Sequence, residues 1–241
     1  IVPRQAVDIM SGVLRRLGFT DVREIALNHV HQLGPSLSIS FHACRADDSA
    51  QIIRAGGRVI VNANDCKLEG RLLEHMRRLA PSPDFYFGQF SFADGYPFCF
   101  EGLSPEDLAA AVRAPLDQFM RQATSFNARW AVPAASFVRF ALGDNCALNR
   151  IALTLDDVAG ECFGAASIWY PGDSWSESVG FIHEPANRRA YERACLEMRQ
   201  SETPRPAPAT PPAGDVVKAA AAARLRDMCA VLPGWVRRRM G

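Results

Sequence analysis

The chain has 241 residues, 48% of them hydrophobic, and its 27 basic residues nearly balance its 26 acidic residues, for a formal net charge of +1. This balance gives no reason to expect general attraction to nucleic acid or to a membrane surface. The length suffices for one large domain with a buried core, and no segment approaches the length of a membrane span. With no signal peptide in the sequence, we expect a cytoplasmic protein.

The chain begins with Ile1-Val2-Pro3-Arg4 instead of methionine. An amphipathic helix is predicted directly afterwards, over residues 5–17, with Gly18 in the position of a C-terminal cap. We therefore expect a processed protein or a fragment. Its expected partners are a missing N-terminal segment or a second copy of the chain in a homo-oligomer. Seven scattered cysteines without a CxxC pair indicate reduced, intracellular thiols.

Short strands are predicted next. Residues 22–26 form the first, and residues 37–44 alternate apolar and polar side chains, which is typical of a half-exposed strand. Residues 48–53 and 58–63 are predicted to pair as an antiparallel hairpin around Gly56-Gly57. The first part of the chain is thus a run of antiparallel strands.

The hydrophobic period then changes. Apolar residues at helical spacing predict a helix over 68–79, closed by Ala80-Pro81, and residues 84–90 have the composition of a buried strand. The succession of strand, helix and strand from residue 58 to residue 90 predicts a crossover unit.

The rest of the chain is predicted to alternate helices, strands and loops. Ser104-Pro105 is a strong helix start. In chain order we expect an aromatic loop at 91–100, a helix over 104–126 interrupted by Pro115, a strand over 130–140 with a turn at Pro133, short strands at 151–155, 162–169 and 179–182, and a helix over 187–200.

Composition predicts three segments. Residues 1–200 form the α/β domain, and residues 201–214 are a linker rich in proline and alanine. Residues 215–241 are predicted to form a C-terminal helix.

Asp65 is the first candidate for a catalytic residue. The predicted strand 58–63 ends in Asn64-Asp65-Cys66, and a carboxylate at the C-terminal end of a core strand is where α/β folds place chemistry. The alternative is that Asp65 caps the helix that begins near Leu68.

The histidines give weaker signals. His29 and His31 alternate on one extended segment and could bind a metal, but no third ligand lies nearby in the sequence. His42 and His183 are each interpreted as structural, and His75 as solvent-facing. Asp47-Asp48 is interpreted as a turn. No HExxH, P-loop or GxSxG motif occurs.

The order of segments resembles a known family. The stretches Leu17–Ile25, Asp48–Ile53 and Gly56–Cys66, with Val132-Pro133 and Pro171-Gly172-Asp173, resemble the second part of metallo-β-lactamase-fold proteins. Within these the chain looks closest to the branch of L-ascorbate-6-phosphate lactonase and the CMP-N-acetylneuraminate hydroxylase-like proteins. The resemblance covers residues 1 to 185.

The resemblance implies an αββα metallo-β-lactamase-like sandwich, incomplete at its N-terminus, with a site for one or two zinc or iron ions. Asp65 would match the strand-end aspartate that binds one metal or bridges two. The HxHxDH motif of the family is absent, and residues 140–145 hold no histidine where relatives often have one. The resemblance therefore implies either that the metal site is incomplete or that His42 or His183 completes the ligands beside Asp65.

Two classes of function follow from the resemblance. The first is a metal-dependent hydrolase or oxygenase that acts on a small molecule through a metal-bound water or oxygen species. The alternative is a non-catalytic binding or scaffold protein with a degenerate metal site. A further expectation is that the aromatic loop, with Tyr96, Trp130, Trp169 and Trp175, lines a pocket for an apolar or ring-containing substrate, although such residues are more often part of a core.

Overall fold

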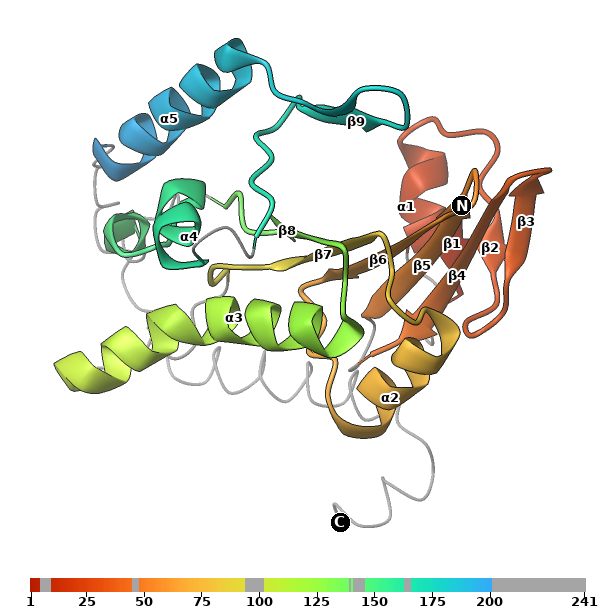
Figure 1. The fold of residues 1–241 in the computed structure, drawn as a ribbon, viewed down its shortest axis with the longest axis horizontal. Coiled ribbons are helices and arrows are strands. Elements are labelled where there is room, and N and C mark those ends of the chain that lie inside the picture. Colours follow the sequence, from red (N-terminus) through yellow and green to blue (C-terminus); the bar gives the residue numbers. More distant parts are fainter. Residues whose placement is uncertain are drawn as a thin grey trace, which may run out of the picture. The chain divides into compact units, whose positions relative to one another are not determined.

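A mixed sheet of six strands organises the computed structural model of this chain (Figure 1), in the order β3-β4-β5-β6-β7-β8. The structure describes residues 1–4, 10–44, 48–93, 102–138, 140, 146–162 and 166–200. The mixed α/β class predicted from the sequence is confirmed. The predicted linker and C-terminal helix, and the loop residues 94–100 with Tyr96, lie outside the described residues.

Antiparallel strands form the first half of the sheet. They are β3 (His31–Gly34), β4 (Leu37–Ala43), β5 (Ser49–Ala55) and β6 (Arg58–Asn64). The hairpin predicted between β5 and β6 is confirmed, with Ala55 opposite Arg58. Gly56 and Gly57 both have positive φ, 55° and 83°, as a two-residue turn that matches the strand twist requires.

Parallel strands form the second half. After β6 the chain passes through α2 (Gly70–Leu79) to β7 (Phe85–Gln89), and through α3 (Pro105–Phe126) to β8 (Trp130–Ala134). Both connections join parallel neighbours, so the predicted crossover unit is confirmed and is followed by a second one.

Helices α2 and α3 cover one face of the sheet (Figure 1). Buried Val61 and Tyr86 point to this face, where they join Met76 of α2 with Leu116 and Phe119 of α3 in the main core cluster. Burial of these apolar side chains is the main stabilising contribution to the arrangement.

Aromatic side chains cover part of the opposite face. Phe85 packs against Trp130, Trp169 and Trp175, with ring centroids 4.8, 5.7 and 5.2 Å apart. Trp175 belongs to the hairpin of β9 (Ser174–Ser176) and β10 (Gly180–Ile182). These tryptophans therefore build a packed cluster, and the predicted substrate pocket among them is not found in the described residues.

The hairpin of β9 and β10 is held at the start of β6. The Arg58 guanidinium donates to Asp84 at 2.8 Å and also to Glu177 of the hairpin. The same guanidinium lies 5.7 Å from the centre of the Trp175 ring. An arginine that bridges two carboxylates in a fixed geometry orients the hairpin on the sheet.

Proline positions differ from the sequence prediction. Pro133 lies inside β8 and pairs with Gly88, where a turn was predicted, because β8 is the last strand of the sheet and an edge strand tolerates a missing N–H. Helix α3 continues through Pro115 because Leu116 and Phe119 anchor the following turn in the core. Its predicted end at Phe126 is confirmed.

Several shorter elements also differ from the prediction. Strands were predicted at residues 151–155 and 162–169, but the described residues of both ranges form no strand, and α4 (Leu155–Cys162) fills the stretch between them. Thr154 and Asp157 exchange hydrogen bonds at its start, which is a helix-capping arrangement. In contrast, α5 (Pro185–Gln200) and β10 are close to the predicted helix and strand.

The N-terminal segment pairs two short strands, β1 (Val2–Pro3) and β2 (Glu24–Ile25), on either side of α1 (Met10–Arg16). The 3-10 turn Cys146–Arg150 precedes α4. None of the helices in the described ranges is long and apolar enough to cross a membrane.

Candidate functional site

The three parallel strands end at one edge of the sheet. In their register Asn64 of β6 lies beside Gly88 of β7, which lies beside Pro133 of β8. We call the residues that follow these strands (64–66, 89–91 and 134–136) the carboxyl edge. Ligand sites of sheets with parallel strands lie outside this end of the strands.

Asp65 lies at the carboxyl edge and is exposed. The preceding Asn64 adopts a left-handed conformation with φ of 53°, and its side-chain amide donates to Oδ1 of Asp65 at 2.6 Å. Helix α2 begins only at Gly70, after an N-cap at Glu69. The capping interpretation of Asp65 is therefore wrong, and its carboxylate remains available at the edge.

Asp48 is a charged neighbour of Asp65. Partial burial and the negative charge of Asp48 both raise the pKa of Asp65. No basic side chain among the described residues forms an ion pair with either carboxyl group. Two like charges are thus held close together without a basic partner in the part of the chain that the structure describes.

Two thiols lie beside these carboxyl groups. Cys66 is buried, and burial, with smaller effects of Asp48 and Cys44, raises the pKa of its thiol. A protonated thiol is a poor metal ligand and a poor nucleophile. The described residues contain no group of three or more His, Cys, Asp or Glu side chains that could hold a metal ion. By themselves they therefore do not fit a zinc or iron centre.

His42 lies under α2 on β4, two strands from β6. It pairs with Ala50, and the next residue, Gln51, pairs with Asn62, so His42 is level with Ala63 at the end of the sheet that carries Asp65. Its side chain is 2% exposed, with Nε2 2.9 Å from the Ser40 hydroxyl and the ring 5.6 Å from that of His75. Nδ1 is buried without a hydrogen-bond partner in the described structure. Burial, with a smaller effect of His75, lowers the pKa of His42 to about 4. His75, predicted to face solvent, is half-buried against this ring.

His183 lies toward the other end of the parallel strands. Its ring packs on Phe181, which packs on Trp130. Trp130 is level with Phe85 and hence with Ile60, five residues before Asp65 on β6. At about 3.3 Å per residue, Trp130 and Asp65 are therefore separated by roughly 15 Å in the direction of the strands. His183 is thus away from Asp65, whereas His42 is at the same end of the sheet but buried under α2, and neither belongs to a group of three or more metal-ligand side chains among the described residues.

The remaining histidines do not form a metal site in the described structure either. His29 is exposed before β3, and Nε2 of His31 lies 3.2 Å from the carbonyl oxygen of Ala26. A ring nitrogen engaged by a backbone carbonyl is explained by local structure.

Asp173 of the Pro171-Gly172-Asp173 motif organises the start of α5. Its carboxylate accepts hydrogen bonds from the amides of Tyr170 and Glu184 and from the Asn187 side chain, and it pairs with His183. Burial opposes ionisation, but these donors outweigh it and lower the pKa of Asp173 to about 2. The turn motif in the sequence pointed to this position but not to its partners.

Two buried serines, which the sequence analysis missed, connect the ends of β7 and β8. The Ser136 hydroxyl accepts from the amides of Phe90 and Ser91 at 3.1 and 2.9 Å and lies 3.0 Å from the Ser91 carbonyl oxygen. The Ser91 hydroxyl accepts from the amide of Leu153. Their hydroxyls are therefore structural, and no motif in the sequence marks them.

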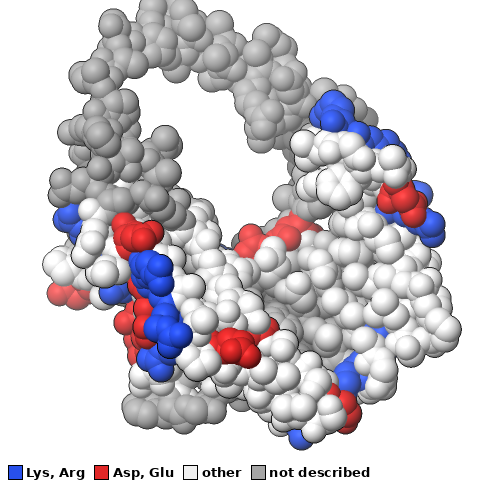
Figure 2. All heavy atoms as spheres, turned by 90° about the horizontal axis from the view of Figure 1, so that it is seen from above, with Lys and Arg blue, Asp and Glu red and all other residues white. Residues whose placement is uncertain are grey.

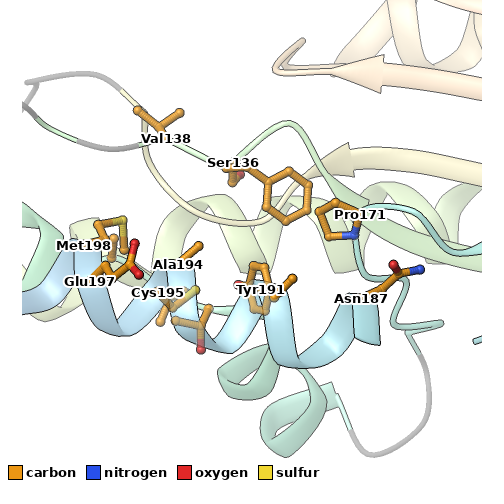
Figure 3. Close-up of a pocket in the computed structure, with 14 residues that line it drawn as sticks. Ser136, Val138, Pro171, Asn187, Tyr191, Ala194, Cys195, Glu197 and Met198 are labelled. Atoms are coloured by element: carbon orange, nitrogen blue, oxygen red, sulfur yellow. The ribbon is translucent and has the colours of Figure 1, made fainter. Parts of the chain in front are cut away.

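A cavity of about 430 Å³ opens next to Ser136 (Figure 3). It lies between the segment 136–138, the segment 152–154 and one side of α5. Adjacent strands are about 4.8 Å apart, so β8 lies roughly 10 Å from β6 along the same edge. The cavity is thus beside the part of the sheet that carries Asp65. Figure 2 shows basic and acidic side chains in small mixed clusters on the described surface of one face.

No protein-family profile matches this chain, and no curated protein matches it by sequence. Similar solved structures include the diiron β-hydroxylase CmlA from Streptomyces venezuelae, at 18% identity and a TM-score of 0.39, covering 52% of this chain and 27% of that one. Zinc-bound PqqB from Methylobacterium extorquens has 15% identity and a TM-score of 0.33, covering 47% and 40%. The metallo-β-lactamase fold protein YhfI from Bacillus subtilis has 13% identity and a TM-score of 0.41, covering 69% and 60%.

This chain thus spans between 27% and 60% of the length of these three proteins. Such low identities and TM-scores describe a partial likeness and assign no activity to this chain.

Proposed function

We propose that this chain forms part of a metal-dependent hydrolase or oxygenase of the metallo-β-lactamase kind that acts on a small molecule. In this proposal Asp65 is the catalytic and metal-binding carboxylate of the chain. The observation that carries it is the position of Asp65: exposed at the carboxyl edge, free of a capping role, and next to Asp48 without a basic partner among the described residues. A cation at this place would relieve the repulsion between the two carboxylates.

The sequence resemblance supports the same proposal. It is strongest over residues 58 to 100, and the described part of this region includes the strand, helix and parallel strand that bring Asp65 to the edge. Because the described residues do not fit a complete metal centre, the other ligands would have to come from outside them. Of the two histidines that the resemblance suggested as further ligands, His42 lies at the same end of the sheet as Asp65 but is buried under α2, and His183 lies toward the other end.

Metal binding tests the proposal. We expect zinc, iron or manganese ions to raise the melting temperature of the full chain and to remain bound after dialysis at a stoichiometry measured by mass spectrometry. Asp65→Ala should abolish both effects. Asp21→Ala is the matched control, because Asp21 is also an exposed aspartate but pairs with Arg23. Retention of metal by Asp65→Ala, or no metal in the unaltered chain, would overturn the proposal.

The second candidate is a non-catalytic binding or scaffold protein. The absence of a three-ligand group from the described residues favours it. This candidate predicts that none of the three metals changes the melting temperature of the chain, whereas small-molecule binding persists in Asp65→Ala. Stoichiometric metal that depends on Asp65 would eliminate it.

A further inference from the structure

The cavity beside Ser136 has one wall formed by α5. Asn187, Tyr191, Cys195 and Met198 recur at helical spacing along the side of α5 that faces the segment 136–138 (Figure 3). No described residue of α5 is fully buried. The helix therefore presents a largely apolar stripe to a cavity whose volume lies in the range of small-molecule sites.

Most polar groups of the cavity wall already have partners within the protein. The Ser136 hydroxyl is engaged by the ends of β7 and β8, and the Thr154 hydroxyl donates to Asp157. The Tyr191 hydroxyl accepts from the amide of Leu155, and the Asn187 amide donates to Asp173. These residues contribute shape and apolar surface, because their hydrogen-bonding groups point elsewhere.

Glu197 is different. It is exposed on α5 beside Met198, and it is the only charged side chain among the described residues that line the cavity. Among the described residues no arginine, lysine or histidine pairs with its carboxylate. The described walls of the cavity thus combine apolar surface with one negative charge that no described basic residue pairs with.

Aromatic rings line the end of the cavity away from Glu197. The rings of Phe137 and Tyr191 meet edge to face, with centroids 5.9 Å apart, and Phe137 is 51% exposed. A half-exposed aromatic ring beside a cavity offers apolar surface that a ligand can cover. A ring or an aliphatic body of a ligand would fit against Phe137.

We propose that this cavity binds a small ligand with an apolar or aromatic body and a protonated amine, which pairs with Glu197. If the ligand is the substrate of an enzyme, this inference rests on the proposed function. Binding of the ligand to the cavity does not require a metal. The amine matches the one available charge of the wall, and the apolar body matches the surface of Phe137, Tyr191 and Met198.

Three probes of one shape and different charge test this inference: tryptamine, its neutral alcohol tryptophol, and indole-3-acetate. Dissociation constants are measured by NMR titration of the full chain in the presence of a chelator. We expect tryptamine to bind about five- to tenfold more tightly than tryptophol, the gain of one partly exposed ion pair, and indole-3-acetate to bind most weakly. Equal affinity for tryptamine and indole-3-acetate, or no binding of any probe, would overturn the proposal.

Variants locate the site. Glu197→Gln should remove the preference for tryptamine and leave the affinity for tryptophol unchanged. Glu192→Gln on the same helix is the control for charge, because Glu192 pairs with Arg188 and does not line the cavity. Ala194→Leu should weaken all three probes by filling the cavity. A loss of preference in Glu192→Gln as large as that in Glu197→Gln would contradict the assignment.

The two proposals fail separately. Since binding is measured with a chelator present, it does not depend on metal, and Asp65→Ala should bind tryptamine as the unaltered chain does. Loss of metal binding with intact tryptamine binding would remove the proposed function alone. Intact metal binding without a preference for tryptamine would remove this inference alone.

Discussion

Nδ1 of His183 lies 2.8 Å from Oδ2 of Asp173, and the Asp173 side chain is 1% exposed whereas that of His183 is 52% exposed. The buried member of this pair is thus the carboxylate. The Asp173 carboxylate also accepts hydrogen bonds from two backbone amides and from the Asn187 side chain. The pair therefore joins β10 to the first turn of α5. This explains why His183 serves the structure and not the carboxyl edge.

Asp173→Asn should lower the free energy of unfolding by about 2 kcal/mol at pH 7, because the shift of the pKa from 3.8 to about 2 measures the preference of the fold for the ionised form. The folded-state pKa lies below the unfolded one, so this stability is fully present above pH 4 and is lost as the pH falls toward 2. Urea unfolding from pH 3 to pH 7 checks this. An equal deficit at all pH values would contradict the assignment. Asp21→Asn, an exposed control, should have a small effect.

His42 should make the protein sensitive to mild acid. Its pKa is lowered from 6.5 to about 4, so the unfolded chain binds a proton more readily than the folded one. Stability is therefore complete above about pH 6.5 and falls by about 3 kcal/mol down to about pH 4. His42→Gln should flatten this part of the stability curve measured by urea unfolding, whereas exposed His29→Gln should leave it unchanged. A steep slope that persists in His42→Gln would show that other groups cause it.

Asp48 and Asp65 should show coupled effects on stability. Each carboxylate destabilises the other at neutral pH, so Asp65→Asn and Asp48→Asn should each stabilise the chain by roughly 0.5 kcal/mol. After one replacement the second should add little, since the repulsion is then already gone. Thermal unfolding of both single variants and the double variant measures this coupling. Strictly additive effects would mean that the two carboxyl groups do not interact.

Gly172 should tolerate no side chain. Its φ is 102°, and an added Cβ would come within 2.8 Å of the Asn187 amide, which donates to Asp173. Gly172→Ala should therefore destabilise the chain by about 2–3 kcal/mol, combining backbone strain with displacement of Asn187. Gly180→Ala is the matched control, because Gly180 has φ of 82° with open space around it, and should cost about 1 kcal/mol. Equal losses in urea unfolding would exclude the steric contribution.

Local sequence determined much of the fold. The turn at Gly56-Gly57, the helix start at Ser104-Pro105 and the strand that ends before Asp65 were all predictable, because turn chemistry and hydrophobic period act over a few residues. The same local reasoning failed for residues 151–169. There a short apolar run fits a strand or a helix equally well, and a cap at Thr154 decides for the helix.

The tertiary structure alone decided the surroundings of the candidate residues. The sequence placed Asp65 at a strand end but could not show that it caps no helix, that it lies near Asp48, or that His42 is buried under α2. These are contacts between residues far apart along the chain, and they depend on strand register and helix packing. For the same reason the cavity at Glu197 became visible only after α5 had packed beside the carboxyl edge.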